Sequence, residues 1–473
     1  MKKSTVLMTV VLFALLLPMM LLSIVPAAMQ DATATPLPTI TSVPPVAKPE
    51  GAIEVSFWYG LGGQLGNVVQ ETVNRYNQSQ STYYINAIFQ SSYDDTINKI
   101  NAGLASGDLP NLAQIFEAGT QRMIDTGSIV PVQSLMERDG LLSVIDDMEP
   151  AVRANYVVNG TLYSAPFNSS TAMLFIDRAA FAAAGLNPDE PLVTFEQVAE
   201  YARALTVKDA NGNVTRYGIG LYPEGWFMEQ IHAVHNAFMG TPDNGIFGRM
   251  EQYTYNDAIG VQWLEWMKQL VDEGVAIYYG PGGGNAAGAA YANGEIAMHF
   301  SSIAGLRSFI ASAERSGAGV EVGTVYMPRN EGVEGKTIVG GASLWITNTG
   351  TPEQQEGAWD FIKWALTPEI QAFWSINTGY IPVLQSAYEL PEMQEALVRY
   401  PQFQVAVDQL RGAEIAPANT AHISGTFVPM RLDVVKAIDD FIMGNAPSAQ
   451  AALDAAVASS NEILEEYNLT VAP

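Results

Sequence analysis

Short apolar runs alternate with amphipathic stretches along most of the chain. Residues 53–59 ("IEVSFWY") and 83–90 ("YYINAIFQ") have the β-branched and aromatic content of strands, and "NLAQIFEAG" repeats this strand-then-turn pattern. Between the first two strands, Val69, Val73 and Tyr76 recur at helical spacing. Strand–helix–strand alternation predicts an α/β fold with parallel strands, in which ligands bind at the carboxyl ends of the strands.

Length and composition narrow this picture. The chain has 473 residues, which exceeds what one compact core usually needs, so two lobes are expected. The formal net charge of −26 argues against a nucleic-acid partner, although a single cationic side chain can still bind a small anion. The sequence contains no cysteine, which excludes disulfides, thiol catalysis and a lipid-carrying N-terminal cysteine.

The first 28 residues have the order of an export signal. Two lysines precede an apolar run from about Val6 to Val25, and small residues suited to cleavage follow. The run approaches about 20 residues, so it is also long enough to stay as an uncleaved membrane anchor. Residues 29–52 are rich in proline and threonine and predict an extended linker. We therefore expect an exported protein on the periplasmic or extracellular face of the cytoplasmic membrane, either anchored or cleaved.

The glycine-rich turn of residues 60–66 resembles a dinucleotide-binding loop, but the pattern fails. Leu65 occupies the position of the third glycine, and no acid follows the second strand before Asp94. The turn is therefore expected to lead into a helix with its amide groups facing a cleft. Hydrolase and P-loop motifs are absent from the sequence, and His232 and His235 lack the spacing of metal ligands. We expect no cofactor, no metal site and no enzymatic activity.

Several segments, in this order, carry a family resemblance: "FNSSTAMLFIDRAAFAAAGLNPDEPLVTFEQVAEYA", "GGASLWI" and "AWDFIKWALTPEIQAFWSINTGYIPVLQSAYE". They resemble the extracellular solute-binding proteins of ABC importers, in the cluster that includes the maltose-binding proteins. Within that family the strongest likeness is to the glycerol-3-phosphate binders, and it runs from Ile53 to Leu464. The loop "GPGGGNAAG" and the segment "AHISGTF" depart from the family pattern.

The resemblance implies a two-lobe periplasmic-binding-protein fold, of the maltose-binding-protein type, with a hinge between the lobes. The implied boundaries are 53–166 plus 342–385 for lobe 1, and 167–341 plus 386–473 for lobe 2. The crossing segments are expected near residues 164–177, 341–346 and 382–388.

The resemblance also implies a set of ligand-binding residues. Matching the family motifs to this sequence gives Tyr93, Glu117, Ser170, Trp226, Ser302, Gly341, Tyr380 and Arg431. Ser301 is as available as its neighbour Ser302. Arg431 can bind two phosphate oxygens, and the two serines and the Gly341 amide can each donate one hydrogen bond. Glu117 can accept from glycerol hydroxyls, with Tyr93 alongside.

Each of these residues also has an ordinary structural reading. Arg431 can pair with Asp433 or Asp439 on its own helix instead of binding a ligand. Ser170 can be a helix cap, Tyr380 a core aromatic and Trp226 a packing residue. The expected ligand is glycerol-3-phosphate or a glycerophosphodiester, for which the face of Trp226 can hold a quaternary ammonium. The expected partners are this ligand and the permease subunits. The alternatives are an oligosaccharide-binding importer protein and an extracellular hydrolase.

Overall fold

The computed structural model describes residues 40–190 and 192–471, so the expected signal peptide or anchor lies outside this part. Among the helices within those two ranges, none combines the length and the apolar composition that crossing a bilayer requires. Residues 40–52 of the expected linker are described, and they contact the body of the protein. Asn74 Nδ2 donates to the carbonyl of Pro44 at 2.8 Å, and Tyr84 OH donates to that of Val46 at 3.0 Å.

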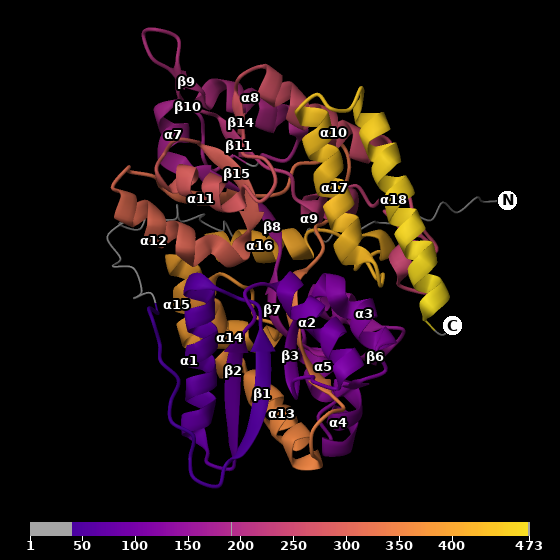
Figure 1. Ribbon diagram of the computed structural model, residues 1–473. Coiled ribbons are helices and arrows are strands. Elements are labelled where there is room, and N and C mark those ends of the chain that lie inside the picture. The colour runs from indigo at the N-terminus through magenta and orange to yellow at the C-terminus, as the bar shows by residue number, and fades with distance from the viewer. Residues whose placement is uncertain (1–39, 191, 472–473) are drawn as a thin grey trace, which may run out of the picture. The chain divides into compact units, whose positions relative to one another are not determined.

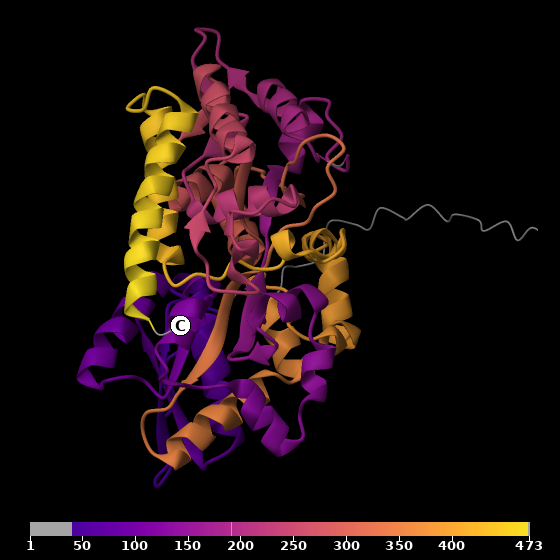
Figure 2. The same cartoon turned by 90° about the vertical axis from the view of Figure 1, so that its right-hand side faces the viewer.

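Six strands form the first sheet, in the order β2-β1-β3-β17-β4, with β7 paired to β17. They are β1 (Ile53–Tyr59), β2 (Tyr83–Phe89), β3 (Leu112–Phe116), β4 (Ile129–Val130), β7 (Ala165–Ser170) and β17 (Gly340–Thr347). β1 runs parallel to β2 and β3, as the sequence pattern predicts. β17 runs antiparallel to β3, β4 and β7, so the sheet is mixed. Figure 2 shows β17 in orange among strands of much lower residue number.

The helices that follow β1 and β2 bring the glycine turn and Tyr93 to the end of this sheet. α1 (Gly63–Ser79) begins at the turn and buries Val69, Val73 and Tyr76, the positions found at helical spacing. α2 (Tyr93–Ser106) is capped by Ser92, whose side chain accepts from the amide of Asp95. The remaining helices of this part are α3 (Thr120–Asp125), α4 (Val132–Asp139), α5 (Ser143–Asp147), α6 (Pro150–Tyr156), α13 (Pro352–Ala365) and α14 (Pro368–Thr378).

Five strands form the second sheet, in the order β14-β11-β15-β8-β16. They are β8 (Ala172–Asp177), β11 (Ile219–Leu221), β14 (Ala276–Tyr278), β15 (Met298–Ser302) and β16 (Val322–Val325). The helices packed around it are α7 (Arg178–Ala183), α8 (Phe195–Leu205), α9 (Gly225–Val234), α10 (Ala258–Asp272), α11 (Gly284–Ala292) and α12 (Leu306–Ser316). α17 (Phe427–Ile442) and α18 (Ala449–Thr470) lie side by side in Figure 1 and pack on α10. α15 (Pro391–Arg399) and α16 (Gln402–Arg411) complete the set.

The chain passes between the two sheets where β7 ends and β8 begins, with one residue between them. Gly341, at the start of the returning strand β17, has a φ of +112°, and a Cβ there would lie 1.9 Å from the carbonyl oxygen of Asn168. Only glycine fits this close approach. The lobe boundaries expected at 166/167 and 341/342 fall inside β7 and β17. They stay a prediction.

Candidate ligand-binding site

A cavity of about 1140 Å³ lies between elements of the two sheets. All eight residues that the family resemblance singled out line it: Tyr93, Glu117, Ser170, Trp226, Ser302, Gly341, Tyr380 and Arg431. Ser301 lines it as well, and so do Gly60, Leu61, Gly62 and Leu65 of the glycine turn. The turn that resembles a nucleotide loop is therefore one wall of this cavity. The volume is on the scale of small-molecule sites, which span about 300–1000 Å³.

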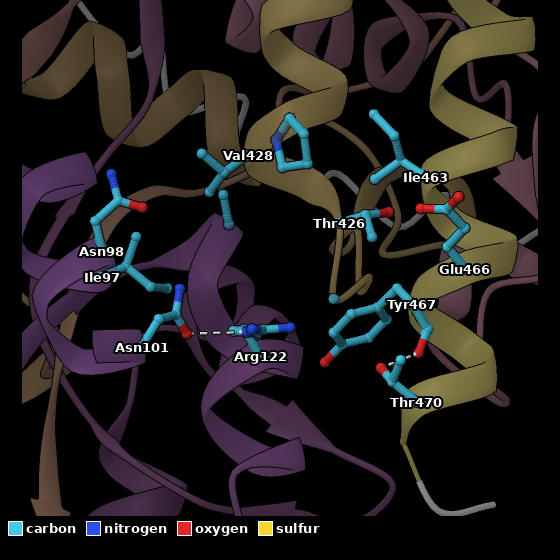
Figure 3. A pocket seen from close by; sticks show the side chains of 13 residues that line it. Ile97, Asn98, Asn101, Arg122, Thr426, Val428, Ile463, Glu466, Tyr467 and Thr470 are labelled. Carbon is cyan, nitrogen blue, oxygen red and sulfur yellow. Dashed lines mark hydrogen bonds between the residues drawn. The ribbon is translucent and has the colours of Figure 1, made fainter. Parts of the chain in front are cut away.

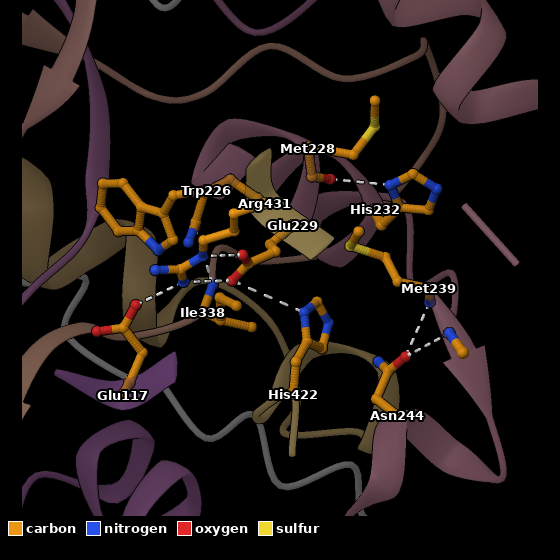
Figure 4. A network of polar contacts seen from close by, with 12 residues as sticks. Glu117, Trp226, Met228, Glu229, His232, Met239, Asn244, Ile338, His422 and Arg431 are labelled. Atoms are coloured by element: carbon orange, nitrogen blue, oxygen red, sulfur yellow. Dashed lines mark hydrogen bonds and ion pairs between the residues drawn. The ribbon is translucent and has the colours of Figure 1, made fainter. Parts of the chain in front are cut away.

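Arg431 is held by two carboxylates that come from distant parts of the chain (Figure 4). Its Nε donates to Glu229 Oε1 at 2.6 Å, and its Nη2 donates to Glu229 Oε2 at 2.9 Å and to Glu117 Oε1 at 2.6 Å. Within residues 40–190 and 192–471, no acceptor contacts Nη1. Because Arg431 lines the cavity, its Nη1 edge is available to a ligand while the rest of the guanidinium is fixed.

The expected alternative partners of Arg431 are engaged elsewhere. Asp433 accepts from Ser460 Oγ at 2.8 Å, and Asp439 accepts from Tyr278 OH at 3.0 Å. The reading in which Arg431 pairs with an acid of its own helix is therefore wrong, although Arg431 does form ion pairs.

Glu117 joins Arg431 to the first sheet. Its Oε1 accepts from Arg431, and its Oε2 accepts from the amide of Gly341 at 3.0 Å. The Gly341 amide, which we expected to face a phosphate, is thus used by Glu117 in this structure. Arg431 and the Gly341 amide, both expected to donate to a phosphate, thus donate to the same carboxylate. Hydrogen-bond donors are therefore already concentrated at this point of the site.

Tyr93 and Tyr380 form a polar pair on the floor of the cavity. Their hydroxyl oxygens lie 3.4 Å apart, and Asn168 Nδ2 donates to Tyr93 OH at 2.9 Å. Asn168 is fixed in turn by Gln114, whose Nε2 donates to its Oδ1 at 2.8 Å. Burial raises the pKa of Tyr380 to about 12 and that of Tyr93 well above its ordinary value, so both keep their protons as donors. Tyr380 is thus a nearly buried aromatic residue that also contributes a hydroxyl group to the lining of the cavity.

Ser170 and Ser302 differ in whether their hydroxyl groups already form hydrogen bonds within the protein. Ser170 lies in β7 and is not a helix cap, and no partner of its Oγ is found in the described residues. Ser302 Oγ accepts from the amide of Ala304 at 3.2 Å and so caps the turn after β15, but its own proton remains available to a ligand.

Trp226 is half-buried and packs against the crossing strand. A Cβ on Gly340 would lie 2.4 Å from Trp226 Cζ2, so the indole rests directly on glycine backbone. A Cβ on Gly225 would lie 2.6 Å from Arg431 Cβ, so this glycine lets the start of α9 approach α17. The two glycines therefore set the relative positions of Trp226 and Arg431.

Carboxylates outnumber cations at this site. Asp94, Glu117 and Glu224 line the cavity, Glu229 lies behind Arg431, and Arg431 is the one cationic side chain among the described lining residues. Burial raises the pKa of Glu229 to about 7 although Arg431 opposes the rise. Burial also raises the pKa of Glu224. The site thus combines one fixed guanidinium with an acidic surround, which suits a ligand that carries both an anion and a cation or several hydroxyls.

A smaller cavity of about 410 Å³ adjoins the site between α2, α3, α17 and α18 (Figure 3). It shares Asn98 with the larger cavity. Its Arg122 is held by Asn101 Oδ1 at 3.0 Å and lies with Cζ 5.0 Å from the centre of the Tyr467 ring. None of the eight expected residues lines it, so we do not include it in the site.

His232 and His235, the two histidines considered as metal ligands, make ordinary structural contacts. His232 Nδ1 lies 2.8 Å from the carbonyl of Met228, and its Nε2 lies 3.2 Å from Asp257 Oδ1. The two nitrogens of His235 contact the carbonyl of Ile231 and the amide of Asn330. No group of three or more potential metal ligands occurs within residues 40–190 and 192–471.

Three functional residues were missed from the sequence: Asn168, Glu224 and Glu229. Glu229 lies three residues after Trp226 on the same helix, and Glu224 lies two residues before it, so the acids around "PEGWF" were a usable signal. Asn168 belongs to the "FNSS" segment that carried the resemblance, but nothing in its spacing pointed to Tyr93.

Comparison with known proteins identifies relatives over most of the chain. A profile of the bacterial extracellular solute-binding proteins matches residues 71–403. The sn-glycerol-3-phosphate-binding periplasmic protein UgpB of Yersinia enterocolitica is 28% identical over 424 residues, covering 88% of this chain and 93% of that protein. The protein of the same name from Salmonella typhimurium is 27% identical over 419 residues, covering 87% and 93%.

Solved structures share the fold. UgpB from Mycobacterium tuberculosis in complex with glycerophosphocholine superposes with a TM-score of 0.72 at 19% identity, covering 89% of this chain and 100% of that one. The cyclic alpha-maltosyl-1,6-maltose binding protein from Arthrobacter globiformis gives 0.67 at 22% identity, covering 88% and 100%. The two-lobe binding-protein fold expected from the sequence is confirmed.

Proposed function

This chain belongs to the bacterial extracellular solute-binding protein family and is the solute-binding component of an ABC importer, and from that premise we propose that its ligand is a glycerophosphodiester such as glycerophosphocholine. Glycerol-3-phosphate is the corresponding monoester, which carries the same glycerol and phosphate groups without the second alcohol. The protein is exported, binds its ligand without breaking a bond, and delivers it to the permease subunits. Whether its N-terminal segment is cleaved or anchors the protein would be decided by N-terminal sequencing of the exported form.

The observation that carries this proposal is the environment of Arg431. Its Nε and Nη2 are fixed by Glu117 and Glu229, its Nη1 has no acceptor within residues 40–190 and 192–471, and Arg431 lines the same cavity as Ser170. A pre-oriented guanidinium loses little entropy when a phosphate oxygen binds it. Each hydrogen bond to a charged group contributes about 1.5–3 kcal/mol. The phosphate would therefore lie between Arg431 and Ser170, with Glu117 accepting from the glycerol hydroxyls.

The charge balance supports a diester over a monoester. A phosphate monoester brings close to two negative charges at neutral pH into a cavity lined by Asp94, Glu117 and Glu224. A glycerophosphodiester brings one, and a cationic head group adds a positive charge that these acids attract. The face of Trp226 can contribute a cation–π contact to the same group.

An oligosaccharide is the second candidate, and the lining of the cavity supports it as well. Three carboxylates can accept from sugar hydroxyls, and Tyr93, Tyr222 and Trp226 offer ring faces for stacking. The Arthrobacter globiformis relative carries a maltosyl ligand in its name. A sugar leaves the Nη1 edge of Arg431 without an anionic partner, which is why we rank this candidate second.

Calorimetric titration of the purified protein with glycerophosphocholine, glycerol-3-phosphate and maltose separates these ligands. We expect binding of glycerophosphocholine, weaker binding of glycerol-3-phosphate and none of maltose. Ser170→Ala should weaken both phosphate ligands, while Ser81→Ala, on an exposed bend and not among the lining residues of the cavity, serves as the matched control. Binding of maltose alone would refute the proposal and favour the sugar candidate.

A further inference from the structure

A second cavity, of about 550 Å³, adjoins the ligand cavity on the side of the second sheet. We call it the annex. The two are neighbouring spaces with a common wall, made of Tyr222, Pro223, Glu224, Gly282 and Ser301. Its other walls come from the glycine-rich segment 280–288 and from α12. That segment is one of the two places where the sequence departs from the family pattern.

The chemistry of the annex is set by one charged group. Among its described lining residues, Glu224 alone carries a charge. Its carboxylate accepts the amide of Trp226 at 3.4 Å and thereby caps α9, but within residues 40–190 and 192–471 it makes no ion pair. A largely buried carboxylate without a cation is costly, and this cost is relieved when a ligand brings a positive charge.

Glycines keep the annex open. A Cβ on Gly284 would lie 3.2 Å from the ring of Tyr222, and one on Gly288 would lie 2.9 Å from Phe309. Larger residues at these positions would fill the space between α11 and α12. On one side, Ser308 Oγ donates to Gln64 Oε1 at 3.3 Å, so a residue of α1 from the first sheet reaches this wall. A residue that follows the first strand thus supports one lining residue of the annex.

The positions of Arg431 and Glu224 match a zwitterion. Both line the ligand cavity, and the charge of Arg431 acts on Glu224, yet the two side chains form no ion pair within 4.0 Å. Two opposite charges that face one cavity without neutralising each other can bind two opposite charges on one ligand.

We propose that the annex is a head-group subsite for glycerophosphodiesters whose alcohol carries an ammonium group, with Glu224 as the counter-charge and Tyr222 alongside. This inference rests on the proposed function, because the phosphate must first lie at Arg431. It assigns the specificity of the protein among diesters to a residue and a cavity outside the set implied by the family resemblance.

The test compares head groups at pH 8, well above the ordinary pKa of 4.5 for a glutamate, because burial raises the pKa of Glu224. Calorimetry would measure the dissociation constants of glycerophosphocholine, glycerophosphoethanolamine and glycerophosphoglycerol for the intact protein and for Glu224→Gln, which keeps the shape of the side chain and its capping oxygen. We expect the intact protein to prefer the two cationic ligands, and Glu224→Gln to reduce that preference about tenfold to a hundredfold, because the variant removes the negative charge that attracts the ammonium group.

A second variant tests the location without touching the charge. Ala289 lines the annex and is exposed on α11, so Ala289→Trp should fill the annex and weaken the cationic diesters more than glycerol-3-phosphate. Ala286→Trp is the matched control, because Ala286 is exposed on the same helix and is not among the lining residues of either cavity.

The outcomes separate this inference from the proposed function. If no phosphate ligand binds the intact protein, the proposed function itself is wrong. If the three diesters bind equally well, or if both Glu224→Gln and Ala289→Trp leave the preference for cationic head groups intact, the subsite is wrong and the proposed function stands.

Discussion

Replacing Arg431 with methionine tests how the cleft is held together. The substitution keeps much of the length of the side chain but removes all of its hydrogen bonds. In the described residues there are three, to Glu229 and Glu117, at 2.6, 2.9 and 2.6 Å. Glu229 is 1% exposed and has no other cation within hydrogen-bond distance in the described residues, so the variant leaves a buried carboxylate uncompensated.

The expected cost follows from that geometry. Three charged hydrogen bonds at about 1.5–3 kcal/mol each set an upper bound, and breaking one partner of a buried ion pair typically costs about 3–5 kcal/mol. We expect the free energy of unfolding to fall by about 3–5 kcal/mol at pH 8. The fold should survive, but any loss of ligand binding must be compared with this loss of stability.

The pH dependence of this cost has a definite sign. The pKa of Glu229 in the folded protein, about 7, lies above its ordinary value of 4.5. The folded state therefore binds this proton more tightly, and the contribution of Glu229 to stability falls as pH rises from 4.5 to 7. Arg431 opposes the rise in pKa, so removing it extends the fall to higher pH. The cost of Arg431→Met should be smaller at pH 5.5 than at pH 8.

Guanidinium denaturation followed by tryptophan fluorescence at the two pH values measures this cost. Arg153→Met is the control, since Arg153 pairs with Asp146 at 3.5 Å on an exposed surface and should cost under about 1 kcal/mol. The double variant Arg431→Met with Glu229→Gln should recover part of the lost stability. A cost below about 1 kcal/mol at pH 8, or a larger cost at pH 5.5, would refute the reasoning.

Two further outcomes follow from the same site. An anion beside Arg431 should raise the pKa of Glu229, so binding of glycerophosphocholine should be accompanied by uptake of a proton. The affinity should therefore increase as pH falls from 8 to 6, by at most about tenfold per pH unit. Calorimetry on Glu229→Gln should show a weaker dependence of affinity on pH. Gly340→Ala should displace the Trp226 indole, lower the free energy of unfolding by about 1–3 kcal/mol and weaken ligand binding, measured by denaturation and titration. Gly248→Ala, whose Cβ would meet only Pro242 at 3.6 Å, should change neither quantity appreciably.

Much of the fold could be predicted because its signals are local. The strand content of residues 53–59 and 83–89 and the helical spacing of Val69 and Val73 depend only on neighbouring residues, and the structure has these elements as expected. The antiparallel course of β17 could not be derived in this way, because it depends on pairing with β3, more than two hundred residues earlier in the chain.

The candidate site could likewise be predicted from the sequence only in part. The eight expected residues line one cavity because the motifs that carry them belong to the strand ends and helix starts of the family fold. The partners of Arg431 were not found, because Glu229 is separated from it by 202 residues and Glu117 by 314, and only the folded chain brings them together. An acid three or four residues away on the same helix is the pairing that sequence reasoning favours. In the folded protein, Arg431 pairs instead with two acids that are distant in the sequence.

The position of a bound phosphate tests the central claim most directly. A crystal structure of the protein with glycerophosphocholine should show a phosphate oxygen within about 3.2 Å of Arg431 Nη1, with Ser170 Oγ donating to the same group. A phosphate that lies away from Arg431 while the ligand occupies the cavity would contradict the account.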